Sequence, residues 1–169
     1  ADIINDISAM RFDPAMVDIA RQAACPVIIM HMQGTPGDMQ IKPSYNDIIA
    51  ETLDFFRQRL AWLSENGIDR HRIIIDPGIG FGKTVEHNLT IINNLERYQV
   101  LKCPVLVGHS RKSFITRVLG DEIDRDNATA TISAICAGKK AAIVRVHDVA
   151  KSRAAITLAQ AIEQERPCH

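Results

Sequence analysis

Short runs of apolar, mostly β-branched residues alternate with longer stretches of helical spacing along the whole chain. Continuous apolar strands that alternate with helices are typical of parallel strands covered by helices. The predicted strands lie at 3–4, 27–30, 73–75, 105–107 and 143–146. The predicted helices lie at 13–24, 44–67, 84–98, 127–137 and 148–164, with a further short helix after residue 112.

Capping residues indicate where several of these helices begin and end. Ser44 with Asp47 three positions later resembles a capping box, and Gly67 can end the same helix. Thr84 and Asp148 are predicted to cap two later helices.

The size of the repeating unit limits the possible fold classes. Five βα units in 169 residues give about 34 residues per unit. A complete (β/α)8 barrel takes roughly 250 residues, or about 31 per unit. The spacing therefore fits a TIM barrel from which three units are absent, and it fits an open doubly wound sheet equally well. The chain lacks an initiator Met and opens in a strand-like run, so we expect one domain over 1–169 that is incomplete at its N-terminus.

Composition narrows the classes of partner. The chain is 46% hydrophobic and 24% charged, and its 20 Lys and Arg balance 20 Asp and Glu. Zero formal net charge argues against broad electrostatic capture of nucleic acid or of an anionic membrane. No apolar run reaches the roughly 20 residues that cross a bilayer. Four widely spaced cysteines, without a C-x-x-C pair, predict neither a disulfide framework nor a zinc site and suggest a reducing cytoplasm: Cys25, Cys103, Cys136 and Cys168.

In either architecture ligands bind where parallel strands end. The segment after the third strand, from Asp76 to Lys83, misses both the P-loop and the Rossmann pattern by one residue. Its glycines favour a loop whose backbone approaches a flat ligand, although a simple tight turn remains possible. Asp76 follows three isoleucines and should be at least partly buried, and a buried carboxylate needs partners or a ligand. It could accept two hydrogen bonds from the amidine-like edge of a pterin or guanine, or it could be a helix cap or an ion pair.

A cluster of cations predicts an anion site. Arg111 and Lys112 stand at the start of a helix, where positive charge is mildly unfavourable unless an anion binds. Arg145 and His147 have the same alternation parity on the next strand and should point the same way. These four donors together predict a phosphate or pyrophosphate site. His31, between two methionines, is either a core histidine or a ligand-binding one.

Six segments, taken in order, resemble the dihydropteroate synthase family. The combination of the third, fifth and sixth is highly specific, whereas the first alone is weak. The segments are INDIS (4–8), MHMQGTPGDMQ (30–40), DPGIGFGK (76–83), HNL (87–89), VGHSRKSFI (107–115) and RVHDV (145–149).

The resemblance implies a pterin-binding TIM barrel and assigns residues to three subsites. Asp76, Lys112, Arg145 and His147 would carry the catalytic roles. The subsites would be Asn5, Ile7, Met30, Asp76 and Lys112 for the pterin; Arg145 and His147 for the pyrophosphate; and Phe81, Ser110, Arg111 and Lys112 for p-aminobenzoate.

The resemblance also implies an activity and its requirements. The family condenses 6-hydroxymethyl-7,8-dihydropterin pyrophosphate with p-aminobenzoate to give 7,8-dihydropteroate in folate biosynthesis, and it is the target of sulfonamides. It implies a cytoplasmic homodimer, and Mg²⁺ whose protein ligand is expected in the first three βα units. Those units, with a further pterin-binding aspartate, have no counterpart in this chain, so no metal ligand is expected within it.

Two alternatives remain open from the residues. A pterin-binding methyltransferase domain shares the Asn and Asp signature, but it needs no pyrophosphate clamp, and SRKSFI and RVHDV therefore weigh against it. A truncated barrel without catalytic activity is the second alternative, because five parallel strands leave two unpaired sheet edges.

Overall fold

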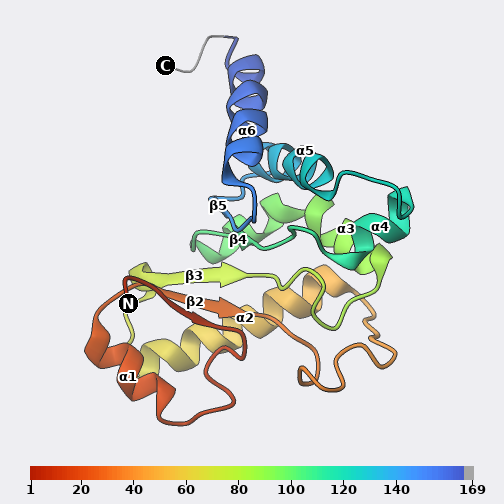
Figure 1. Cartoon of the computed structure of the whole chain (residues 1–169). Coiled ribbons are helices and arrows are strands. Elements are labelled where there is room, and N and C mark those ends of the chain that lie inside the picture. Colours follow the sequence, from red (N-terminus) through yellow and green to blue (C-terminus); the bar gives the residue numbers. More distant parts are fainter. Residues whose placement is uncertain (166–169) are drawn as a thin grey trace.

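Five short parallel strands form the centre of the chain (Figure 1). The structure is a computed structural model and describes residues 1–165. The first three strands form one sheet in chain order, the last two pair with each other, and a parallel bridge between Ile75 and Val105 joins the two groups. The strands are β1 (Ile4–Asp6), β2 (Val27–Met30), β3 (Ile73–Asp76), β4 (Leu106–Val107) and β5 (Ile143–Val144).

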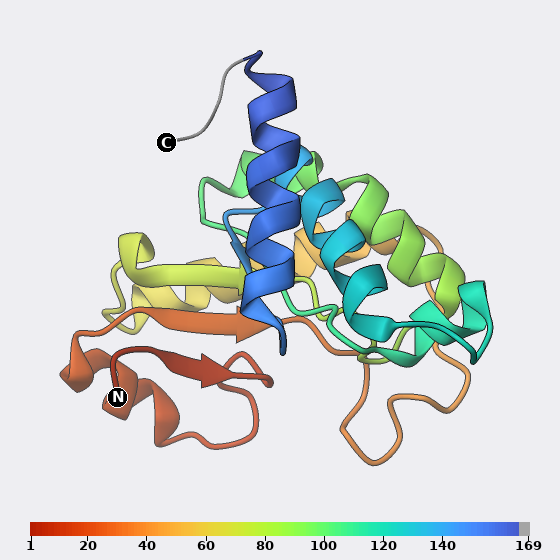
Figure 2. The same cartoon turned by 45° about the horizontal axis from the view of Figure 1, so that its top comes forward.

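Helices connect each strand to the next, as the alternating pattern predicts. Views in Figures 1 and 2 show α1 and α2 beside β1–β3, and α5 lying against α6. The helices are α1 (Met16–Ala23), α2 (Ile48–Glu65), α3 (Val85–Asn93), α4 (Ser113–Leu119), α5 (Arg125–Gly138) and α6 (Val149–Glu163), with 3-10 helices η1 (Arg70–Arg72) and η2 (Leu95–Leu101).

The order of the strands decides between the two candidate architectures. The strands follow one another as β1-β2-β3-β4-β5, whereas a doubly wound sheet reverses its strand order at a switch point. The fold is therefore part of a (β/α)8 barrel.

The two faces of the strands have different roles. Residues such as Ile29, Ile73 and Val107 pack with helix residues such as Phe56 and Leu60 into the main core. The opposite face carries a small separate cluster of one residue from each central strand: Ile28, Ile74 and Leu106. The helices thus cover one face, and the other face is the inside of the barrel wall.

Helix ends differ from the prediction at several points. The first helix, α1, begins at Met16 with Ala15 as its N-cap, and not at residue 13. The N-cap of α2 is Asp47, which accepts from the backbone N–H groups of Ile49 and Ala50, so Ser44 is not the cap. The helix predicted at 84–98 is divided, because Asn94 leaves the helical conformation and α3 ends before it. Thr84, by contrast, caps α3 in a capping box, as predicted in outline.

The cysteines and the helices agree with a simple globular chain. Cys25, Cys103 and Cys136 are unpaired, and the latter two are buried, while Cys168 lies outside the described residues. No helix within residues 1–165 is both long and apolar enough to cross a membrane.

Candidate active site

Strand register brings several predicted site residues onto the inner face. Asn5 is aligned with Ile28 and Met30 with Asp76, so these residues share the face that carries the inner cluster. Leu106 is aligned with Ile143, which gives Arg145 the same parity. The ends of β1, β3 and β5 therefore present polar side chains to the same face, and the end of β2 adds Met30.

Asp76 lies on this face and is 1% exposed. Its Oδ1 accepts a hydrogen bond of 2.8 Å from the backbone N–H of Gly78. Burial raises the pKa of Asp76, and the Gly78 N–H and the charges of Arg145 and Lys83 oppose this shift. The expectation that Asp76 is buried and paired is met, and its pair is Arg145.

Arg145 joins the two ends of the strand series. Its Nη2 lies 3.1 Å from Oδ2 of Asp76, and its Nη1 lies 3.1 Å from Oδ1 of Asn5. Gly108 directly follows β4, and a Cβ added to it would lie 2.6 Å from Nη2 of Arg145. Glycine at this position therefore leaves room for the guanidinium. Asn5 and Asp76 are thus spaced to accept a planar N–C–N group between them.

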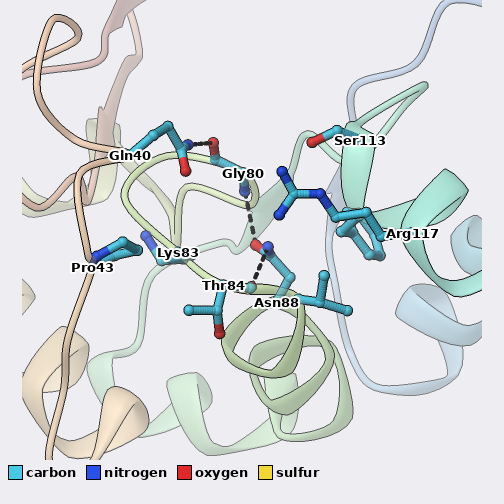
Figure 3. Close-up of a pocket in the computed structure, with 10 residues that line it drawn as sticks. Gln40, Pro43, Gly80, Lys83, Thr84, Asn88, Ser113 and Arg117 are labelled. Carbon is cyan, nitrogen blue, oxygen red and sulfur yellow. Dashed lines mark hydrogen bonds between the residues drawn. The ribbon is translucent and has the colours of Figure 1, made fainter.

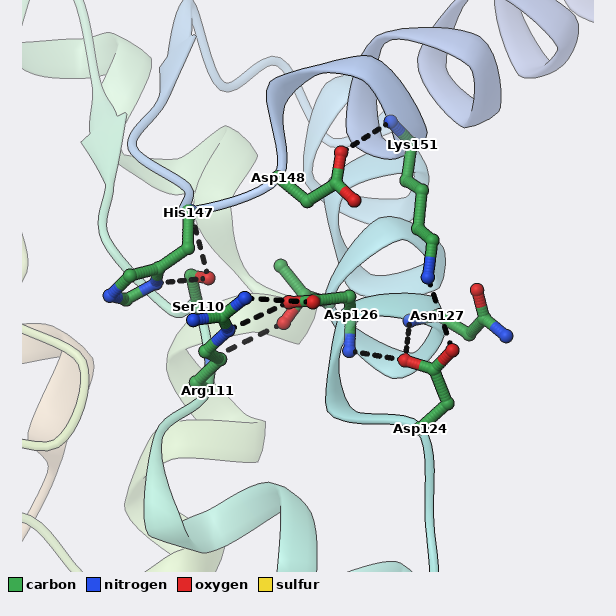
Figure 4. Close-up of polar contacts among 9 residues, drawn as sticks. Ser110, Arg111, Asp124, Asp126, Asn127, His147, Asp148 and Lys151 are labelled. Carbon is green, nitrogen blue, oxygen red and sulfur yellow. Dashed lines mark hydrogen bonds and ion pairs between the residues drawn. The ribbon is translucent and has the colours of Figure 1, made fainter.

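The turn after β4 meets the end of β5 (Figure 4). The Ser110 hydroxyl lies 2.8 Å from Nδ1 of His147 and accepts from the backbone N–H of His147. Ser110 is buried and His147 exposed, so the imidazole is oriented from beneath while one ring edge stays open. This arrangement suits a histidine that donates to an anion.

Arg111 departs from the expectation that it joins the other cations. It has a left-handed backbone with φ of 57°, and its guanidinium donates two hydrogen bonds of 2.8 Å to Asp126 on α5. This ion pair raises the pKa of Arg111. The sequence contains the acidic group but cannot show that α5 brings it to this turn, so Arg111 is a paired residue at the rim (Figure 4).

Lys112 and Phe81 contact each other, as neighbours around one pocket should. The ammonium nitrogen of Lys112 lies 4.2 Å from the centre of the Phe81 ring, in cation–π geometry. Burial lowers the pKa of Lys112, the charge of Arg145 lowers it further, and Asp76 opposes both. Lys112, Arg145 and Asp76 therefore act on one another electrostatically.

A cavity of about 310 Å³ opens beside this contact (Figure 3). Gly80, Lys83 and the first turn of α3 line one side, and Ser113 and Arg117 of α4 line the other. Arg117 has no ion pair or hydrogen bond within residues 1–165. The cavity can therefore receive an anionic group.

The other predicted residues lie near this region with less direct roles. Met30 is buried and packs against Gly78, while Ile7 is half-buried after β1. His109 faces α5 instead, where its Nε2 contacts Thr129 O and Ser133 Oγ.

Sequence reasoning missed Lys83, whose ammonium group contacts His31 beneath the glycine-rich loop. The available signal was a lone lysine at the end of the glycine-rich loop that follows a buried strand. No group of three or more His, Cys, Asp or Glu side chains is arranged to hold a metal ion in the part of the chain that the structure describes.

Comparison with known proteins agrees with this geometry. The sequence pattern of a family described as pterin binding enzyme matches residues 1–147. The chain belongs to the pterin binding enzyme family. The matched range includes Asn5, Asp76, Arg145 and His147, and thus every strand end that contributes to the site.

Individual members of the pterin binding enzyme family are similar over nearly the whole chain. Dihydropteroate synthase of Synechocystis is 41% identical over 152 residues, which are 88% of this chain and 52% of that protein. A Yersinia pestis dihydropteroate synthase solved with a sulfonamide drug has a TM-score of 0.93 at 33% identity, covering 98% of this chain and 61% of the other. The enzyme of Xanthomonas albilineans in complex with 7,8-dihydropteroate has a TM-score of 0.87 at 36% identity, covering 96% and 61%.

The chain spans about half the length of the Synechocystis relative. These comparisons confirm the resemblance to dihydropteroate synthases and the barrel architecture.

Proposed function

We propose that this chain carries the pterin and pyrophosphate face of a dihydropteroate synthase, a transferase that joins 6-hydroxymethyl-7,8-dihydropterin pyrophosphate to p-aminobenzoate. The observation that supports it best is the position of Arg145. Its two terminal nitrogens contact Asn5 and Asp76, and a guanidinium offers the same planar N–C–N donors as the 2-amino edge of a pterin. The ring would take over these acceptors and release Arg145.

The released guanidinium would then serve the leaving group. Arg145 and His147 would hold the pyrophosphate, and Ser110 would keep the imidazole oriented towards it. As the C9–oxygen bond of the pterin breaks, negative charge grows on the pyrophosphate and positive charge on the ring. The hydrogen bonds from Arg145 and His147 stabilise the first and Asp76 the second, so the chain acts by preorganised electrostatics without a protein nucleophile.

The amine of p-aminobenzoate would attack C9 from the side of Phe81 and Lys112. We place its aromatic ring beside their cation–π contact, and its carboxylate towards the adjoining cavity, where Ser113 and Arg117 offer donors (Figure 3). This arrangement orients the amine without requiring a catalytic base in this part of the chain.

Three further properties belong to the proposal. Mg²⁺ would assist pyrophosphate departure, held by groups outside this chain, since the described residues offer no cluster for it. The enzyme would work in the cytoplasm as a homodimer. An apolar groove of about 250 Å³ between α3, α4 and α5, lined by Leu89, Val118 and Ile132 among others, supports self-association.

Light scattering after size-exclusion chromatography should give twice the chain mass of 18.8 kDa. The mass of one chain at all protein concentrations would contradict the dimer.

Calorimetric titration with 6-hydroxymethylpterin and with its pyrophosphate tests the proposed function. We expect the pyrophosphate to increase affinity, and Arg145→Gln to reduce that increase about ten- to hundred-fold, because charge-assisted hydrogen bonds contribute roughly 1.5–3 kcal/mol. Affinity for the unphosphorylated pterin should not fall, since Arg145 competes for its acceptors.

Arg57→Gln, on the exposed side of α2, is the matched control and should change neither affinity. Equal affinity of the wild type for the two pterins would favour a methyltransferase-type pterin site. A folded chain that binds neither would contradict the proposal and leave the truncated, inactive barrel.

A further inference from the structure

Lys83 carries a charge into the interior below the glycine-rich loop and is only 4% exposed. Its Nζ lies 2.9 Å from the carbonyl oxygen of Phe81, 3.0 Å from Nδ1 of His31 and 3.4 Å from the carbonyl oxygen of His31. An ammonium group has three hydrogens, and here it meets three acceptors. Protonated Lys83 is thereby satisfied, whereas a neutral amine would leave one acceptor without a donor.

His31 is held so that it can accept. Burial, and next the charge of Lys83, lower the pKa of His31 to about 2, so the ring is neutral and Nδ1 has a free lone pair. The ring packs edge-on against Phe55 with centroids 4.9 Å apart, and the backbone N–H of His31 donates to Asp76 O at the end of β3. The acceptor is therefore fixed to the neighbouring strand.

The same lysine reaches the wall of the proposed second-substrate pocket. It binds the backbone of Phe81, whose ring lies under the ammonium of Lys112. The two loops are closely packed at this point, because a Cβ on Gly82 would lie 2.8 Å from Gln33 O. A small shift of the loop after β3 would therefore move the Phe81 ring relative to Lys112.

We propose that Lys83 is a positioning residue whose protonated side chain fastens the loop after β3 to the end of β2 and thereby fixes Phe81 against Lys112. This rests on the proposed function, in which Phe81 and Lys112 flank p-aminobenzoate. Lys83 acts through Phe81: Lys83 lines the cavity proposed for the carboxylate, but its ammonium group is engaged by three acceptors of the protein. Its protonation state would thus set the shape of the second-substrate pocket while leaving the pterin acceptors in place.

The titratable groups around this contact are His31 from the end of β2, Asp76 from β3, Arg11, whose charge lowers the pKa of His31, and Tyr45, whose hydroxyl donates to Gly82 O. Burial lowers the pKa of Lys83 to about 7, and the Asp76 charge opposes this. His31 stays neutral near pH 7. A change at Phe81 with a midpoint near pH 7 that depends on Lys83 would therefore be its signature.

Fluorine NMR of the chain labelled with 4-fluorophenylalanine tests the proposal without any ligand. The five phenylalanines give five resonances, and Phe81→Leu identifies that of Phe81. We expect the Phe81 resonance to titrate with a midpoint near pH 7 in the wild type and to lose this titration in Lys83→Met. Phe114 is an internal reference, and Lys139→Met, at a half-buried lysine that is paired with Glu96 at the C-cap of α5, is the matched control that should keep the titration.

A Phe81 titration that survives in Lys83→Met would assign it to another group, such as His147, and would overturn the proposal. So would a wild-type resonance that does not move between pH 6 and 8.5, and this second arm needs no folded variant. Calorimetry separates the proposal from the proposed function: Lys83→Met should bind the pterin pyrophosphate within about three-fold of the wild type. A loss of affinity as large as that of an Asp76 variant would place Lys83 in the pterin site and overturn the proposal. A wild type that binds no pterin would contradict the proposed function, but it would leave the NMR result on Lys83 and Phe81 unchanged.

Discussion

Asp76→Asn is expected to weaken binding of a pterin pyrophosphate analogue by roughly a hundred- to ten-thousand-fold. The carboxylate is buried on the inner face, where one ring N–H donor would replace Arg145 at Oδ2 while Gly78 keeps Oδ1. The variant loses this hydrogen bond and leaves the buried ring donor unsatisfied, which costs about 1–3 kcal/mol more. Each charge-assisted hydrogen bond contributes about 1.5–3 kcal/mol, and each 1.4 kcal/mol is ten-fold in affinity. Asparagine keeps the shape and can still accept from Gly78, but it turns an amide N–H₂ group towards the donor of the ring. Calorimetric titration measures the loss directly.

Two measurements show that such a loss comes from the site. Asp54→Asn, on the exposed side of α2, should bind like the wild type. Stability should respond to pH in the opposite sense to an ordinary ion-paired carboxylate. Because burial raises the pKa of Asp76, the folded chain binds this proton more tightly than the unfolded chain, and the free energy of unfolding falls as pH rises from about 4 towards the raised pKa. Asp76→Asn should remove this fall. Unchanged affinity in Asp76→Asn would exclude Asp76 from pterin binding.

Gly78→Ala is expected to lower the free energy of unfolding by more than about 3 kcal/mol, a large part of the roughly 5–15 kcal/mol that a domain has. Gly78 has φ of 72°, which costs a residue with a Cβ about 1–2 kcal/mol. The added Cβ would also lie 2.0 Å from the carbonyl oxygen of His31. That oxygen cannot retreat easily, because the His31 N–H is bonded to Asp76 O across the sheet. Urea denaturation followed by Trp62 fluorescence measures the change.

Two other glycines separate the contributions. Gly120 has φ of 88° and open space where its Cβ would stand, so Gly120→Ala measures the cost of the conformation alone. Gly138, at the end of α5, also has open space and no positive φ, and its substitution by alanine should be neutral or slightly stabilising. If Gly78→Ala and Gly120→Ala lost the same amount, the contact with His31 would have no energetic weight.

Local signals in the sequence predicted much of the fold. Runs such as 27–30 and 73–75 are buried strands because both of their faces are covered, and Asp148 caps the last helix as its position suggested. Local signals failed where two residues could do the same work. Ser44 and Asp47 are both favourable N-cap residues, and the sequence alone does not distinguish them. In the structure Asp47 is the N-cap. The break at Asn94 likewise has no strong sequence signal, since asparagine is tolerated within helices.

The site was predictable to the extent that it follows from strand ends. Asp76 and Arg145 could be named because each stands near the end of a predicted strand, and parity grouped Arg145 with His147. Their contact with each other, the pairing of Arg111 with Asp126, and the burial of Lys83 depend on groups far apart in sequence. Lys83 and His31 are 52 positions apart, and Arg111 and Asp126 are 15 apart on different elements. Periodicity carries no information about such distances.

The hydrogen bond between Arg145 and Asn5 has a consequence for how the chain is made. The two residues are 140 positions apart, and a contact of that separation cannot form before its later member has been synthesised. Chains fold from the N-terminus during translation, so β1, β2 and β3 can assemble while Arg145 is still within the ribosome. Asp76 on β3 therefore has no guanidinium partner during this interval. The arrival of β5 supplies the missing charge, so the binding face is completed last, in nearly the final step of synthesis of the described chain.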